Sequence, residues 1–113
     1  MISSFEELQV WKRACRLAVK IYKVFSICKD FGLKDQIQRA AVSIPSNIAE
    51  GKERNSVAEF KRFLNIAKGS AAELRTQLYI AREINLIDKK EADEMIQEAK
   101  EISKMLQALT NTL

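Results

Sequence analysis

The sequence predicts an all-α fold, an antiparallel up-down-up-down four-helix bundle. Its 113 residues include one proline and three glycines, so residues that form turns are scarce. No segment alternates β-branched and polar residues as a strand would, whereas apolar residues return every three or four positions in four successive segments. Turns of about four to six residues between these segments favour antiparallel neighbours. At 12.9 kDa, residues 1–113 are expected to form a single domain.

The first helix is expected to begin after a capping box, in which the side chains of Ser4 and Glu7 satisfy free backbone amides. It carries two apolar seams, displaced by about 100° around the helix axis. The first seam comprises Leu8, Trp11, Cys15, Ala18, Tyr22 and Phe25, and the second Val10, Ala14, Leu17, Ile21, Val24 and Cys28. A monomeric bundle needs one apolar stripe per helix, so the second seam favours self-association. The alternative is a single wide stripe on a fully buried helix.

The second helix is expected from about Leu33 to Glu50, with Asp30 as a candidate cap. Pro45 lies inside it, where it removes one backbone donor and should bend the helix between Ala41 and Pro45 without breaking it. Gly51 is expected to end the helix in the left-handed conformation. The apolar face of this helix comprises Ile37, Ala40, Ile44 and Ile48.

Cap signals also mark the last two helices. Ser56 and Glu59 repeat the capping-box pattern before a third helix that should continue to about Asn85, a residue that tolerates the left-handed conformation. Asp88 with Glu91 is expected to open the fourth helix. The apolar positions are Phe60, Leu64, Ala67, Ala71, Leu74, Leu78 and Ala81 in the third helix, and Ala92, Met95, Ala99, Ile102, Leu106, Leu109 and Leu113 in the fourth.

The composition argues against most catalytic chemistry. The chain has no histidine, and its two cysteines, Cys15 and Cys28, would lie about 20 Å apart on one helix, too far for a disulfide. No metal-ligand spacing and no glycine-rich phosphate loop is present. Neither a signal peptide nor a run of about 18 apolar residues occurs. We therefore expect a cytoplasmic protein that is not an enzyme, needs no metal or other cofactor and does not associate with a membrane.

Polar residues form a second face on the second and third helices, called here the polar seam. In an antiparallel hairpin, this pattern places Arg39 against Glu73, Ser43 against Gly69 and Ser70, and the other members in similar pairs. A buried Arg39–Glu73 pair would fix the register, and the small residues would let the helices approach closely. A ligand pocket is the alternative, and the seam could face the core, a subunit interface or a pore. Its members are Gln36, Arg39, Ser43, Asn47, Glu50, Arg62, Ser70, Glu73 and Gln77.

The run from Arg39 to Gly51 has the sequence Arg-Ala-Ala-Val-Ser-Ile-Pro-Ser-Asn-Ile-Ala-Glu-Gly. With Leu8-Gln-Val-Trp11, Glu59-Phe60, residues 66–70, Glu73-Leu74 and residues 76–78, it resembles the four-helix-bundle proteins encoded by intervening sequences of bacterial 23S ribosomal RNA genes. The resemblance implies a ring-shaped homopentamer. It also implies a distant kinship with accessory proteins of diversity-generating retroelements, which bind nucleic acid and associate with a reverse transcriptase. It implies no catalytic residue.

The net charge of +4 is unevenly distributed. Six basic and no acidic residues lie from Lys12 to Lys29, whereas residues 88–104 include six acidic and four basic ones. In a ring, a basic helix face would repeat in every subunit and hold phosphate backbones without sequence preference. The alternatives are a solvated face or one that pairs with the acidic fourth helix of a neighbouring subunit. The candidate nucleic-acid-binding residues are Lys12, Arg13, Arg16, Lys20 and Lys23.

Two functions of different classes follow from these observations. The first is an oligomeric accessory protein that binds RNA or DNA through a basic helix face. The second is a structural scaffold or protein-interaction module that binds no nucleic acid.

The two seams of the first helix predict self-association. Light scattering at micromolar concentration should give a molar mass several times that of the 12.9 kDa chain, and five times if the family resemblance holds. A monomer mass under these conditions would remove the argument from the second seam.

Overall fold

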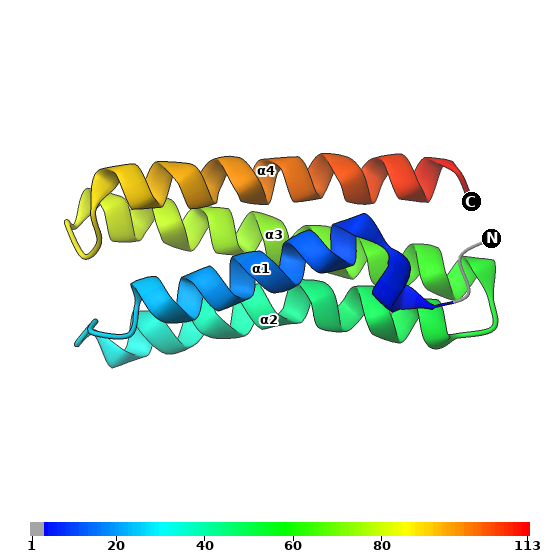
Figure 1. Cartoon of the computed structure of the whole chain (residues 1–113), viewed down its shortest axis with the longest axis horizontal. Helices are drawn as coiled ribbons and strands as arrows, with labels where there is room; N and C mark the ends of the chain where they lie inside the picture. The colour runs from blue at the N-terminus through cyan, green and yellow to red at the C-terminus, as the bar shows by residue number, and fades with distance from the viewer. Residues whose placement is uncertain (1–3) are drawn as a thin grey trace.

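Four α-helices make up almost all of the structure, a computed structural model that describes residues 4–113. The helices lie side by side along the long axis of a molecule measuring 43 × 20 × 19 Å, with the C-terminus and the first short helix at the same end (Figure 1). No strand occurs among these residues, so the predicted all-α class is confirmed for them. The elements are the 3-10 helix η1 (Phe5–Glu7), α1 (Gln9–Val24), α2 (Phe31–Glu53), α3 (Val57–Glu83) and α4 (Lys89–Asn111).

Side-chain caps begin three of the four helices as the sequence predicts. The carboxylate of Asp30 accepts a hydrogen bond from the amide of Leu33 at 3.1 Å, at the start of α2. Ser56 and Asp88 do the same for the amides three residues later, at 3.2 and 3.3 Å. Each cap satisfies an amide that has no partner within its helix. Asn85 has a φ of 57°, which confirms the predicted left-handed residue after α3.

The start of α1 differs from the prediction. Ser4 accepts from the amide of Glu6 at 3.2 Å, not from that of Glu7, and it caps η1. The helix α1 begins only at Gln9, because Leu8 has an extended backbone and turns its side chain into the core. The intervening turn also brings the ring of Phe5 edge-on to Trp11, with 5.3 Å between the ring centroids.

Gly51 does not end α2, contrary to the prediction. The helix continues to Glu53, and no glycine in the described residues has a positive φ. Gly51 is buried against α3, where an added Cβ would lie 2.5 Å from the Cβ of Phe63. Gly69, expected to allow close approach, is instead exposed, and an added Cβ would meet nothing within 4 Å. The glycine required for the close contact of α2 with α3 is therefore Gly51.

The core lies between all four helices and contains the predicted apolar face of α2. Pro45 is buried within α2, which continues through it. The described bundle buries most of the second apolar seam of the first helix and part of the first seam. This burial fits the alternative of a single wide stripe, although Tyr22 of the first seam remains 47% exposed. No helix within residues 4–113 is long and apolar enough to cross a membrane. The buried side chains that fill the centre include Ile21, Phe25, Ile37, Ile44, Ile48, Leu64, Leu74, Leu78, Met95, Ile102 and Leu106.

The two helical glycines give a matched pair of mutations. Replacing Gly51 with alanine should lower the free energy of unfolding by about 1–3 kcal/mol, because the new methyl group overlaps the Cβ of Phe63. Replacing Gly69 with alanine should raise it by up to about 1 kcal/mol, because alanine favours the helix and the position is open. Urea unfolding of the two variants checks both signs, and equal changes would contradict the close contact at Gly51.

Candidate nucleic-acid interface

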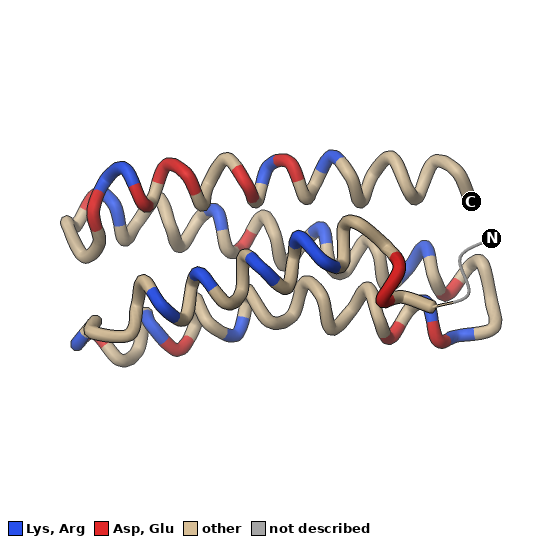
Figure 2. The backbone as a smooth tube through the Cα atoms, viewed as in Figure 1, with Lys and Arg blue, Asp and Glu red and all other residues tan. Residues whose placement is uncertain are grey.

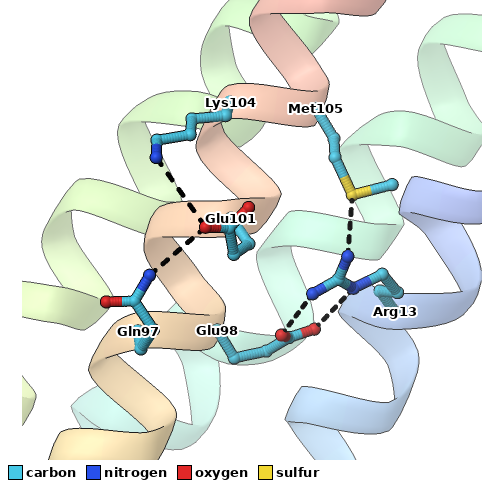
Figure 3. Close-up of polar contacts among 6 residues, drawn as sticks. All are labelled: Arg13, Gln97, Glu98, Glu101, Lys104 and Met105. Atoms are coloured by element: carbon cyan, nitrogen blue, oxygen red, sulfur yellow. Dashed lines mark hydrogen bonds and ion pairs between the residues drawn. The ribbon is translucent and has the colours of Figure 1, made fainter.

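The predicted basic residues lie on α1 beside the acidic half of α4 (Figure 2). Arg13 donates two hydrogen bonds to Glu98, from Nε at 2.8 Å and from the terminal nitrogen at 2.6 Å (Figure 3). Its other terminal nitrogen contacts the sulfur of Met105 at 3.5 Å. The hydrogen bonds to Glu98 raise the pKa of Arg13 above its ordinary value. Arg13 therefore joins α1 to α4 and is occupied within the chain.

Lys20 is also held by α4. Its Nζ lies 3.1 Å from a carboxylate oxygen of Glu94 and 3.6 Å from one of Glu91. The hydrogen bond to Glu94 raises the pKa of Lys20. Two residues of the basic face, Arg13 and Lys20, thus pair with the acidic fourth helix of their own chain.

Three of the five predicted residues remain without an ion pair among residues 4–113: Lys12, Arg16 and Lys23. Arg16 and Lys23 are exposed and Lys12 is half-buried. Steps of four and seven residues keep all three on one side of α1. A cavity of about 290 Å³ next to Arg16 is lined by both acidic and basic side chains, so it does not favour an anion. The free cations on the outer surface of α1 are therefore the part of the predicted face that can contact phosphates.

The polar seam has a hydrogen-bonded centre between α2 and α3. The hydroxyl groups of Ser43 and Ser70 lie 2.9 Å apart. The Nδ2 atom of Asn47 donates to the hydroxyl of Ser43 at 2.9 Å and to its carbonyl at 2.8 Å. The predicted opposition of Ser43 and Ser70 is confirmed.

The predicted Arg39–Glu73 pair is wrong. The side chain of Arg39 is 80% exposed and donates to Asp35, one turn earlier on α2, at 2.8 Å, and Glu73 is exposed on α3. A carboxylate one turn away is within reach of an exposed arginine, which avoids the cost of burying both charges between helices.

The remaining charged members of the seam also pair along their own helices. A carboxylate oxygen of Glu50 lies 3.5 Å from a terminal nitrogen of Arg54. The Nε atom of Arg62 donates a hydrogen bond to the carboxylate of Glu59 at 2.9 Å. Gln36 is exposed, whereas Gln77 is only 6% exposed and its Oε1 has no hydrogen-bond partner among residues 4–113. The predicted continuous seam is therefore a small central network, a set of exposed pairs and one buried amide.

A family model described as 23S rRNA-intervening sequence protein matches residues 6–108. The chain belongs to this family. A crystal structure of a protein of unknown function from the S23 ribosomal protein family of Bacteroides thetaiotaomicron is similar to it, with 30% sequence identity and a TM-score of 0.84. The match covers 89% of this chain and 97% of that one. No curated protein matches the chain. The resemblance stated from the sequence is confirmed, and neither name assigns an activity.

In this 23S rRNA-intervening sequence protein, the run that carries the resemblance forms the middle and the end of α2. Ile44, Pro45, Ile48 and Gly51 from this run are buried. Their side chains, and the missing side chain of Gly51, build the contact of α2 with the core and α3. These four residues of the run therefore serve the packing of α2.

The sequence interpretation noted the acidic fourth helix but placed its pairing with the basic face between neighbouring subunits, and it named none of the individual acidic partners on α4. Glu91, Glu94, Glu98 and Glu101 follow at steps of three, four and three residues, which places them on one face of a helix. That spacing matches the spacing of the basic residues on α1 and could have indicated which carboxylates pair with them. The two helices are the first and the last in the chain. No short loop joins them, so the sequence did not indicate that they are neighbours.

Removing the partner of Arg13 tests the α1–α4 charge contact. Replacing Glu98 with glutamine should lower the free energy of unfolding by about 1 kcal/mol, because a partly buried, bidentate pair loses its negative charge. Replacing the exposed Arg39 with alanine should cost less than about 0.5 kcal/mol. Urea unfolding at low and high salt compares them, and a Glu98 effect no larger than the Arg39 effect would refute the prediction.

Proposed function

We propose that this protein is a cytoplasmic, non-enzymatic accessory protein that binds RNA or DNA through the phosphate backbone. The observation that carries the proposal is the set of free cations on α1. Lys12, Arg16 and Lys23 lie on one side of that helix without ion pairs among the described residues. Phosphate contacts of this kind give binding that is independent of sequence and weakens steeply with salt.

The proposed active form is a ring-shaped oligomer, for which the family resemblance favours five subunits. Its subunit is an up-down-up-down bundle with α2 bent near Pro45. Exposed apolar side chains support self-association, since Tyr22 and Val19 lie one turn apart on the outer side of α1. A ring multiplies a weak basic surface, because every subunit presents the same three cations to one polyanion. A partner protein such as a reverse transcriptase is proposed from the family kinship alone.

The second candidate function is a scaffold or protein-interaction module that binds no nucleic acid. The pairing of Arg13 and Lys20 with α4 favours it, because these two charges stabilise the fold and are not available to phosphates.

Charge-neutral variants distinguish the two functions. Changing Lys12, Arg16 and Lys23 together to glutamine should reduce the slope of log affinity against log salt by about 0.7 per lost contact for single strands and about 0.9 for duplex DNA. Fluorescence anisotropy with labelled oligonucleotides at several salt concentrations measures this slope. The matched control changes Arg39, Arg54 and Arg62 to glutamine, which removes the same charge from residues that already have ion pairs.

The control variant should keep the native slope. If the native protein binds no nucleic acid even at low salt, the scaffold function is correct. If it binds and the α1 variant has an unchanged slope, the free cations of α1 are not the contact surface.

A further inference from the structure

A second set of cations lies along the boundary between α3 and α4, which run side by side (Figure 1). Two side-chain contacts fix how these helices face each other. Arg82 on α3 donates to Asp93 on α4 at 2.6 Å, and Lys68 on α3 donates to Gln107 on α4. The residue number rises along α3 as it falls along α4, so the two helices are antiparallel.

These two contacts place Arg75 opposite Lys100. Arg75 lies seven residues from both Lys68 and Arg82, and Lys100 lies seven residues from both Asp93 and Gln107. Seven residues are about two helical turns, so each returns to the face that makes the observed contacts. Both side chains are half-buried, and neither forms a hydrogen bond or ion pair with any of residues 4–113.

No carboxylate lies one turn from either member of this like-charge pair on its own helix. The neighbours one turn away on α3 and α4 are apolar, uncharged or basic. Glu101 follows Lys100 directly, but its carboxylate accepts a hydrogen bond from Gln97 and lies 3.7 Å from Nζ of Lys104 (Figure 3). Its negative charge also helps to raise the pKa of Arg13 on α1. Like charges that face each other destabilise a helix pair unless an anion lies between them. The neighbours on both helices are Ala71, Ala72, Leu78, Tyr79, Ile96, Gln97, Ser103 and Lys104.

The same spacing extends the cations into a line. Lys61, Lys68 and Arg75 follow at seven-residue steps of about 10.5 Å, so they span about 21 Å along α3. All three are half-buried, which leaves their charged ends at the surface while their stems pack on the bundle. Tyr79 lies one turn beyond Arg75, is 38% exposed, and has the guanidinium of Arg82 5.2 Å from its ring centroid. We call Lys61, Lys68, Arg75 and Lys100 the α3–α4 stripe.

We infer that the α3–α4 stripe binds the backbone of a single-stranded nucleic acid, with one phosphate between Arg75 and Lys100. A straight line of cations beside an exposed aromatic ring suits one flexible strand, because the cations follow the backbone and the ring stacks on a base. This inference rests on the proposed nucleic-acid function and adds a second surface to it, on the other side of α4 from the free cations of α1.

The first test measures how the affinity of the purified protein for a labelled oligouridylate depends on salt concentration. The Arg75→Gln/Lys100→Gln variant should lose about 0.7 from the slope of log affinity against log salt, equivalent to the one phosphate that the two cations share on a single strand. The matched control Arg39→Gln/Arg54→Gln removes the same charge from paired residues and should leave the slope unchanged. Equal slopes for the Arg75→Gln/Lys100→Gln variant and the native protein overturn the inference. This holds even if the reduced slope of the α1 variant shows that the protein binds nucleic acid. Tighter binding of duplex DNA, with the same dependence on Arg75 and Lys100, overturns the single-strand assignment.

Thermal unfolding tests the anion site with a ligand that carries phosphates but no nucleobases. At low salt, Arg75→Gln should raise the Tm, because it removes one of two facing cations, and the gain should disappear at high salt. Inorganic polyphosphate should raise the Tm of the native protein more than that of the Arg75→Gln/Lys100→Gln variant. If polyphosphate shifts the Tm in this way while neither oligouridylate nor DNA binds at low salt, the proposed function fails and the anion site alone stands. Equal shifts in both proteins overturn the anion site.

Discussion

The contact between Gly51 and Phe63 controls how closely α2 and α3 approach, and the arrangement of the bundle depends on that approach. A side chain at position 51 would have to overlap α3, so the helices meet at this end only because Cβ is absent. About 12 Å along α2, the same approach brings the hydroxyl of Ser43 within hydrogen-bonding distance of Ser70. The large apolar residues of both helices are fully buried in the centre of the bundle.

The parts of the fold that depend on neighbouring residues could be predicted from the sequence. Asp30, Ser56 and Asp88 cap their helices because a side-chain oxygen needs only the amide three residues later. Gly51 shows the limit of this reasoning, since a glycine near a helix end serves equally well as a left-handed cap or as a place for close packing. Only the position of Phe63 on a different helix decides between these roles.

The candidate interface was predicted less completely, because charge is balanced across helices that are distant in the chain. The basic residues of α1 have no acidic neighbour on their own helix, yet Arg13 is held by Glu98, 85 residues away. Conversely, Arg75 and Lys100 are unremarkable in the sequence, and their opposition is visible only once Arg82 and Lys68 have fixed the α3–α4 register. Helix faces follow from periodicity, whereas the register between faces needs the three-dimensional structure.

The buried side-chain amide of Gln77 lowers the stability of the bundle. Its Oε1 has no partner within the described protein, and a buried acceptor left unsatisfied costs about 1–3 kcal/mol. Methionine has nearly the same length and flexibility and carries no such acceptor, so the same backbone can accommodate a more stable sequence. Replacing Gln77 with methionine is therefore expected to stabilise the bundle, as is common where folding need only exceed a threshold.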